Sequence, residues 1–164
     1  MAVSTPGIST LGVKFGYQAE STSGTKPSTF VWLERCNSIG GITLESEQID
    51  ASALEDEISK YVSGRQDSGG TWNVTFNITN DTVSQLETMI TAYTTAKAAN
   101  KNMWFEVWSP SLTKAFFVIA QPPLHLPMPE MGQNELQTIE LTFTIQEYKG
   151  MDTAIEPQAA SSNP

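Results

Sequence analysis

Thr71-Trp72-Asn73-Val74-Thr75-Phe76-Asn77-Ile78-Thr79 is the stretch of sequence that decides the fold. Its even-numbered positions are all apolar, and its odd-numbered positions are all Thr or Asn. Period-two alternation rich in β-branched and aromatic residues predicts a half-buried strand. Burial of four apolar side chains of this size contributes roughly 1.5–3 kcal/mol each, so a register with the apolar face inward is strongly preferred.

The segment before this strand is long, polar and without a clear period. It contains Tyr61, Arg65 and the turn Asp67-Ser68-Gly69-Gly70, and its residues 54–61 could form at most one or two helical turns. Loops of this length inside a compact domain are usually functional or disordered. We therefore predict a long loop at about residues 50–70. Its place beside an uncharged polar strand face favours a surface that contacts other copies of the protein.

The rest of the pattern predicts a mainly β protein with one helix. Alternation or short apolar runs predict strands at about residues 11–18, 30–33, 43–50, 103–108, 114–120 and 135–148. A helix is predicted over about 82–99, with Asp81 as N-cap and Thr82 and Gln85 at capping-box spacing. The apolar stripe of this helix comprises Val83, Leu86, Met89, Ile90, Tyr93 and Ala96.

The length of 164 residues is typical of one domain with a sizeable core. We assign residues 1–149 to a single β domain, of which residues 1–10 form an N-terminal arm. Residues 150–164 are rich in Pro, Ala and Ser and cannot bury enough surface to fold alone. An extended C-terminal tail is predicted there.

The composition argues against tight binding to nucleic acid and against export. The formal net charge is −9, and the nine basic residues are scattered without a cluster. Charged residues make up 16% of the chain, against roughly 25% in most soluble domains, which is consistent with surface that becomes covered in an assembly. No signal-like pattern or membrane-spanning apolar run is present, so we expect synthesis in a cytoplasm and no membrane contact.

No set of residues has the pattern of a catalytic or metal site. His125 is the single histidine and lies among prolines, and Cys36 is the single cysteine, whereas a structural zinc site usually needs four such ligands. Glu45 with Glu140 is a formal possibility for a glycosidase pair, but no cleft signature accompanies it. We therefore predict a protein that is not an enzyme and has no catalytic residues, cofactor or metal.

Short motifs between residues 39 and 78 resemble those of the major tail tube proteins of long-tailed bacteriophages. In order, they are Ile39-Gly-Gly-Ile42, Glu47-Gln-Ile-Asp50, Ala53-Leu-Glu-Asp56, Tyr61-Val-Ser-Gly64, Asp67-Ser-Gly69 and Trp72-Asn-Val-Thr-Phe76. The order of the expected elements extends the resemblance to about residue 148. Ala51-Ser52-Ala53 departs from the Thr-containing stretch that is commoner in the family.

The resemblance implies an antiparallel β-sandwich or rolled barrel flanked by one α-helix. It implies hexameric rings that stack into a tail tube, through whose lumen DNA passes without specific binding. The implied partners are other copies of the chain and other phage tail proteins, namely the tape measure, the tail terminator and the baseplate or tip. The protein would then be a structural part of the virion, assembled in the host cytoplasm.

Two sets of candidate residues follow from this implied assembly. The inter-ring contact is assigned to the loop at 50–70, through Asp56, Tyr61, Arg65 and Asp67. The lumen is assigned to Glu140, Thr142 and Thr144 together with Glu45 and Glu47, because glutamates there would repel phosphate and let DNA slide.

A carbohydrate-binding β-sandwich module is the alternative interpretation. Its binding site would be a stacking platform made of Trp32, Trp72, Trp104 and Trp108. All four tryptophans lie in apolar strand patterns, which favours packing in the core. Solvent-exposed, coplanar tryptophans would support the alternative.

Overall fold

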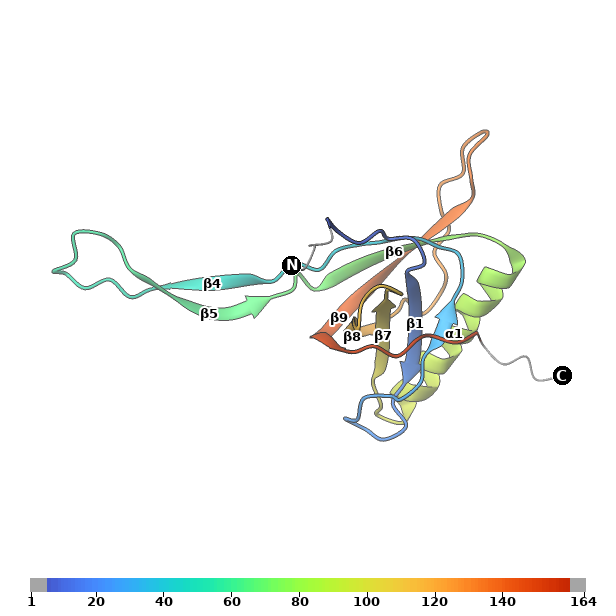
Figure 1. Ribbon diagram of the computed structural model, residues 1–164, viewed down its shortest axis with the longest axis horizontal. Coiled ribbons are helices and arrows are strands. Elements are labelled where there is room, and N and C mark those ends of the chain that lie inside the picture. The colour runs from blue at the N-terminus through green and yellow to red at the C-terminus, as the bar shows by residue number, and fades with distance from the viewer. Residues whose placement is uncertain (1–5, 160–164) are drawn as a thin grey trace, which may run out of the picture.

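The structure is a computed structural model that describes residues 6–159. It comprises a curled sheet, one helix and a projecting two-stranded arm (Figure 1). The elements in chain order are β1 (Lys14–Ala19), β2 (Val31–Leu33), β3 (Cys36–Ile39), β4 (Glu45–Asp50), β5 (Tyr61–Asp67), β6 (Thr71–Asn77), α1 (Asn80–Ala98), β7 (Met103–Trp108), β8 (Lys114–Gln121) and β9 (Thr138–Thr153). The predicted fold class, mainly β with one helix, is confirmed.

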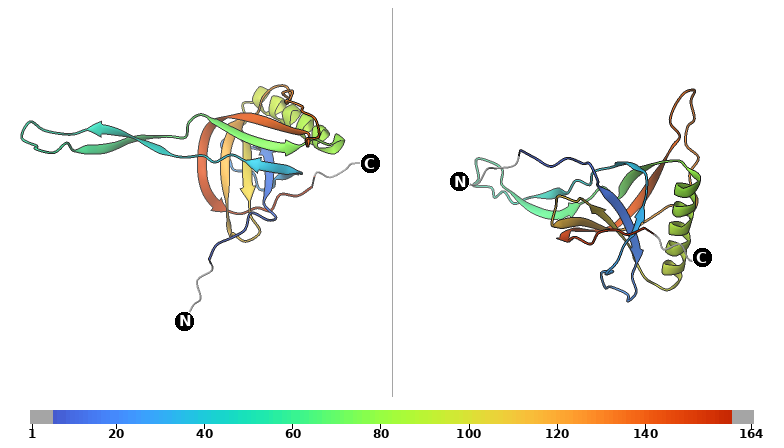
Figure 2. Two further views of the ribbon diagram at one scale, coloured as in Figure 1. Left: turned by 90° about the horizontal axis from the view of Figure 1, so that it is seen from above. Right: turned by 45° about the vertical axis from the view of Figure 1, so that its right-hand side comes forward.

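The antiparallel sheet is rolled until its two edges nearly meet. Its seven strands have the order β2-β1-β7-β8-β9-β6-β3, yet only Glu34 and Arg35 separate β2 from β3 in sequence. Arg35, with a φ of 59°, adopts the left-handed conformation in this short connection. The sheet must therefore curl round, as Figure 2 shows. Within residues 6–159 no ladder joins β2 to β3, so the result is a rolled sheet and not a closed barrel.

Aromatic and branched side chains fill the inside of the rolled sheet. Trp72 pairs with Phe143 and Val74 with Leu141 across the β6–β9 ladder, and all four are buried. The ring centroids of Phe105 and Phe143 are 4.8 Å apart in an edge-to-face arrangement, the geometry that aromatic pairs prefer. The predicted inward faces of the strands near 71–79 and 135–148 are confirmed.

The helix begins slightly earlier than predicted and has a different cap. Its N-cap is Thr79, not Asp81, and its capping box pairs Thr79 with Thr82, not Thr82 with Gln85. The Thr79 hydroxyl accepts from the Thr82 N–H at 3.1 Å, and the Thr82 hydroxyl accepts from the Thr79 N–H at 2.8 Å. Figure 2 shows α1 alongside the curled sheet, and its buried stripe enters the core through Leu86, Met89 and Tyr93.

The structure corrects the prediction of a loop at residues 50–70. Within this segment, β5 pairs with β4 in a two-stranded ribbon, and residues 51–60 form the irregular tip of that ribbon. The physical reason is that both faces of this ribbon are exposed. A strand with no buried face has no need of alternating apolar residues, so its sequence has no period to detect.

The C-terminal segment is also more regular than predicted. The boundary placed at residue 149 falls inside β9, which continues to Thr153. Residues beyond it lie against the body, and Gln158 forms a parallel bridge with Val31. The predicted N-terminal arm at 1–10 is described only from residue 6, and residues 160–164 of the predicted tail lie outside the described residues.

Candidate assembly surfaces

The ribbon of β4 and β5, residues 45–67, is called the arm and projects far from the body (Figure 1). All six residues of β4 are exposed, as are all residues of β5 except Gly64. An isolated two-stranded hairpin is at best marginally stable in water. The arm therefore gains stability when another surface covers it.

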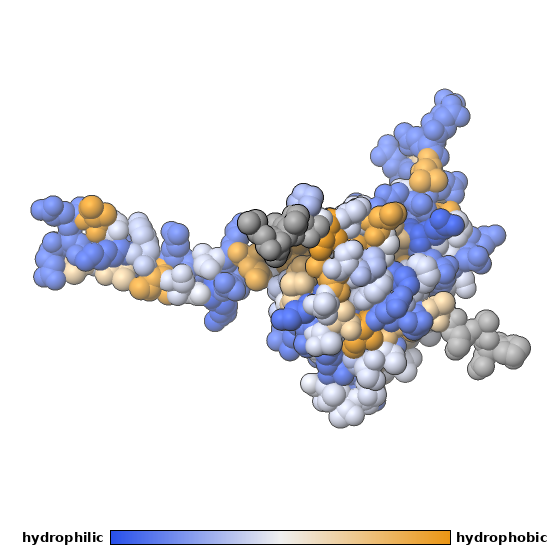
Figure 3. Space-filling model, viewed as in Figure 1, coloured by the Kyte–Doolittle hydropathy of each residue, from blue (hydrophilic) through white to orange (hydrophobic). Residues whose placement is uncertain are grey.

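Large apolar side chains are exposed on the arm. Leu54 and Ile58 near the tip have exposed fractions of 109% and 79%, and Ile49, Tyr61 and Val62 are exposed along the ribbon. Figure 3 shows apolar residues at the far end of the arm. A cluster of exposed apolar side chains on one projection is typical of a protein contact site.

The tip of the arm has a defined turn that its own polar groups hold. The Asp56 carboxylate accepts from the Ala53 N–H at 2.8 Å and forms an ion pair with Lys60 at 2.9 Å. These two contacts, the Ala53 hydrogen bond first, hold the pKa of Asp56 below its ordinary value. The Ser52 hydroxyl also accepts from the Lys60 N–H at 2.7 Å. The turn thus presents Leu54 and Ile58 from a structured loop.

The base of the arm is anchored through the glycine-rich turn that precedes it. The Gly40 N–H donates to the Asn73 carbonyl at 2.7 Å, and the Trp72 indole N–H donates to the Gly40 carbonyl at 2.6 Å. A Cβ on Gly40 would lie 2.7 Å from the Asn73 oxygen, so only glycine fits this close approach. On the other strand, the Asp67 carboxylate accepts from the Gly69 N–H at 2.9 Å.

The four residues predicted for the inter-ring contact all lie on the arm, but not at one point. Tyr61 pairs with Asp50 near the tip and is exposed, whereas Asp67 pairs with Glu45 at the base. Six residues of extended strand place Tyr61 and Asp67 about 20 Å apart. Arg65 lies exposed between them, and Asp56 is engaged with Lys60. Any contact that uses all four residues must extend along the whole arm.

The outer face of β6 and β9 is a continuous polar surface, called the polar face. Three of its cross-strand pairs are Thr71 with Thr144, Asn73 with Thr142 and Thr75 with Glu140. The predicted lumen residues Glu140, Thr142 and Thr144 are exposed together on this face. Glu45 and Glu47 do not belong to this face, because they lie on β4, which is part of the separate two-stranded sheet of the arm.

The tryptophans do not form an exposed stacking platform. Trp72 and Trp104 are buried. Trp32 and Trp108 are half-buried, and the Lys14 ammonium lies 4.6 Å and 5.3 Å from their ring centroids. The arrangement expected of the carbohydrate-binding alternative is therefore not the one that the tryptophans adopt.

The single cysteine and the single histidine lie in different environments. Burial raises the pKa of the Cys36 thiol to about 12, so this cysteine carries the unreactive thiol form. His125 is exposed on the connection between β8 and β9. Between residues 6 and 159, no three His, Cys, Asp or Glu side chains gather as a metal site requires. In the same part of the chain, no helix is both long and apolar enough to cross a membrane.

A second projection was not predicted as a functional surface. Residues 122–137 connect β8 to β9 and extend from the body near the start of β9 (Figure 1). Four of its apolar side chains are exposed, namely Leu124, Met128, Met131 and Leu136. The prolines in this stretch predict only a stiff connection. The sequence feature that could have indicated an interaction surface is the presence of these large apolar residues between polar residues and prolines.

Chains of known structure have a similar fold. A chain in the structure of the tube-terminating cap of the anti-feeding prophage aligns with a TM-score of 0.57 and 15% sequence identity, over 94% of this chain and 95% of that chain. The two chains share a fold. A chain in the six-fold symmetrised structure of the anti-feeding prophage baseplate aligns with a TM-score of 0.49 and 13% identity, over 93% of this chain and 98% of that chain. No protein-family model and no curated protein sequence matches.

Proposed function

We propose that this chain is a structural subunit of a phage-tail-like tube, in which copies close into hexameric rings and the rings stack around a conduit for DNA. The fold shared with a chain of the tube-terminating cap supports this role. The observation that carries the proposal is the exposed arm, which makes no ladder with the body of its own chain among the described residues. The role is structural and requires no catalysis.

The arm is suited to a contact between identical subunits. In the part of the chain that the structure describes, β4 and β5 pair only with each other. Each therefore has an outer edge of backbone N–H and C=O groups to which another strand or loop can bind. An arm that contacts a different surface on the next copy makes a heterologous contact, which generates rings or open stacks. A tube requires both kinds of contact, one between the subunits of a ring and one between stacked rings.

In the proposed tube the polar face lines the lumen. Its Thr and Asn side chains are short and uncharged, and Glu140 adds negative charge, so the surface offers no cation to phosphate. The whole chain carries a net charge of −9, which also disfavours adhesion of DNA. The first and last rings would contact other proteins of the particle, such as the tape measure, the terminator and the baseplate or tip.

We expect Glu140→Lys tubes to retain duplex DNA that wild-type tubes do not retain. The lysine places one cation per subunit in the lumen, so retention should rise about tenfold or more at low salt and disappear at high salt. Fluorescence anisotropy of a labelled duplex mixed with assembled tubes measures this. Glu87→Lys is the matched control, because Glu87 is an exposed glutamate on α1. Equal retention by both variants would contradict the lumen assignment.

We expect Arg65→Glu to prevent assembly without unfolding the subunit. Arg65 is exposed on β5, so its replacement removes no contact in the core, but it reverses the charge at the centre of the proposed contact. Loss of one partner from a charge pair buried at an interface costs about 2–5 kcal/mol. Electron microscopy and sedimentation should show monomers where wild type forms tubes. Lys97→Glu on α1 controls for the charge change alone, and normal tubes from the Arg65 variant would exclude this residue from the contact.

A further inference from the structure

After β9 the chain crosses the outer face of the rolled sheet. Residues 154–158, called the strap, pass over this face toward β2 (Figure 1). The Trp32 N–H donates to the Gln158 carbonyl at 2.8 Å, and the Gln158 N–H donates to the Phe30 carbonyl at 3.0 Å. The strap therefore covers the edge of β2, which would otherwise have unpaired backbone groups at the end of the sheet.

The strap also covers the second apolar cluster of the protein. This outer cluster consists of Phe30, Trp104, Ala115, Phe117 and Ile119, and Ala154 and Ile155 pack against it. Release of the strap would uncover these side chains and the β2 edge together. An apolar surface next to a free strand edge is one that another strand can cover by pairing.

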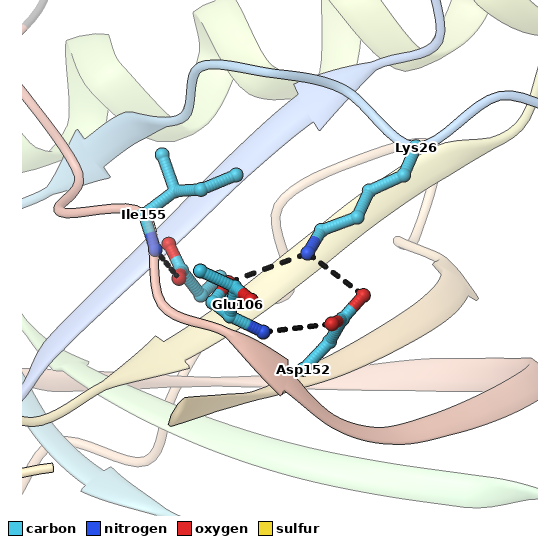
Figure 4. A network of polar contacts seen from close by, with 5 residues as sticks. Lys26, Glu106, Asp152 and Ile155 are labelled. Carbon is cyan, nitrogen blue, oxygen red and sulfur yellow. Dashed lines mark hydrogen bonds and ion pairs between the residues drawn. The ribbon is translucent and has the colours of Figure 1, made fainter. Parts of the chain in front are cut away.

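Two residues of the sheet make close contacts with the strap. Gly16 on β1 lies under Pro157, and a Cβ at residue 16 would lie 2.9 Å from the proline ring. On β7, the Glu106 carboxylate accepts from the Ile155 N–H at 2.9 Å (Figure 4). A glycine and a carboxylate thus lie at two points where the strap docks beside the outer cluster.

Glu106 is an unusual residue to find beneath the strap. Its side chain is fully buried, and its Oε1 atom has no hydrogen-bond partner among residues 6–159. Lys26 is near but forms its ion pair with Asp152 at 3.1 Å (Figure 4). Its ammonium also lies 3.8 Å from the Phe117 ring centroid. A buried carboxylate with an unpaired oxygen reduces stability, so its presence in a folded protein calls for an explanation. A glutamine could accept the same hydrogen bond without titrating.

We propose that the strap is a releasable cover, latched through Glu106, which hides the β2 edge and the outer cluster until a strand of a second copy replaces it. The partner step rests on the proposed function. Besides the Glu106 bond, the strap is held by two backbone hydrogen bonds at Gln158 and one from the Ala154 N–H to the Thr113 carbonyl at 3.2 Å. Ala154 and Ile155 pack on the outer cluster, and a partly exposed ion pair joins Lys14 to Glu156 at 3.0 Å. Ion pairs at the surface typically contribute about 0–1 kcal/mol.

The state of the latch depends on pH. Burial raises the pKa of Glu106 to about 7, while the Ile155 hydrogen bond and the charge of Lys26 oppose this rise. In the proposed released state Glu106 is exposed to water, and its pKa falls back toward 4.5, the ordinary value of a glutamate. The docked strap thus binds a proton more tightly, so docking is strongest below about pH 4.5 and weakens as the pH rises through about 7. The other charged groups around the latch are Lys14, Lys114, Lys149, Asp152 and Glu156.

Amide hydrogen exchange of the unassembled full chain tests the latch. We expect the protection of the Ile155 N–H, corrected for the intrinsic rate, to fall about tenfold to thirtyfold between about pH 5.5 and pH 8. The Leu141 N–H in the core should not follow it. Glu106→Gln should abolish this dependence, whereas Glu156→Gln, which removes an exposed acid of the strap, should keep it. Constant protection of Ile155 in wild type, or a fall shared with Leu141, would overturn the proposal even if the Gln variant does not fold.

Assembly kinetics at about pH 8 test the partner step separately. We expect Glu106→Gln, in which the strap stays docked, to lengthen the lag before polymerisation several-fold relative to wild type and Glu156→Gln. An unchanged lag together with a firmly docked strap would show that the strap is no barrier and would overturn its role as a cover. Failure of every variant, wild type included, to polymerise would overturn the proposed function and the partner step, while the exchange result would still decide the latch.

Discussion

Replacement of residues 47–65 with Asn-Gly is expected to abolish tube formation and to leave the melting temperature of the body within a few degrees of wild type. Ser46 and Gln66 face each other across the β4–β5 ladder, so a two-residue turn can join them. The variant keeps the anchored base of the arm, including Gly40 and Trp72, and loses the ribbon and tip beyond it.

The reason for this separation is that the arm and the core share no buried side chain. Neither apolar cluster contains a residue between 45 and 67. The removed segment exposes Leu54 and Ile58, which in the proposed tube become buried against another subunit. Burial of each would contribute about 1.5–3 kcal/mol per contact, repeated at every subunit, so its loss is enough to prevent polymerisation.

Thermal unfolding followed by near-ultraviolet circular dichroism measures the stability of the body, and electron microscopy with sedimentation measures assembly. A variant with Leu54→Ser and Ile58→Ser controls for the length of the arm, because it keeps the ribbon and removes only the apolar tip. Tubes from the shortened chain would exclude the arm as an essential contact. A melting temperature lowered by more than a few degrees would show that the arm supports the body.

The second large effect concerns the pH dependence of stability. We expect the free energy of unfolding of wild type to fall as the pH rises from about 4.5 through about 7, relative to that of Glu106→Gln. The pKa of Glu106 is raised to about 7 in the folded state by burial, so its stabilising contribution is complete below about pH 4.5 and is lost above about pH 7. One pKa unit corresponds to about 1.4 kcal/mol, so the difference between the two proteins should change by about 1–3 kcal/mol across this window.

Urea denaturation at a series of pH values measures this difference, and any constant effect of the glutamine cancels when the two curves are compared. The pKa values of Asp50, Asp56 and Asp152 are lowered by hydrogen bonds. The contributions of these three aspartates to stability are lost only as the pH falls below the ordinary pKa of an aspartate. This pH range lies below the one in which the contribution of Glu106 is lost. Parallel curves for wild type and Glu106→Gln would contradict the prediction.

The sequence predicted well those elements that have one buried face. Residues 71–77 and 138–145 alternate because one side of each packs in the core, and this decides which face of each strand is buried. The helix was predicted within two residues at its start, since its apolar stripe must face the sheet. The capping residue differed because several Thr and Asp residues near position 80 can accept the same hydrogen bond.

The sequence could not predict elements whose surroundings come from elsewhere in the chain. The ribbon of the arm has no buried face, so no apolar period marks its strands. Glu106 lies in an apolar strand pattern, and nothing local shows that Ile155, far along the chain, will bury it. The candidate lumen residues likewise lie in two different sheets. Strand pairing, which the sequence does not show, places Glu45 in the sheet of the arm and Glu140 in the sheet of the body.

By itself, then, the sequence determined the mainly β class, the single helix and the inward faces of the central strands, because hydrophobic burial is recorded in the local spacing of residues. Only the tertiary structure decided that residues 45–67 form an arm, that the polar face belongs to β6 and β9, and that the strap encloses Glu106. These features depend on contacts, or on the absence of contacts, between segments far apart in the chain. Such relations are set by how the sheet rolls and pairs, which local periodicity does not record.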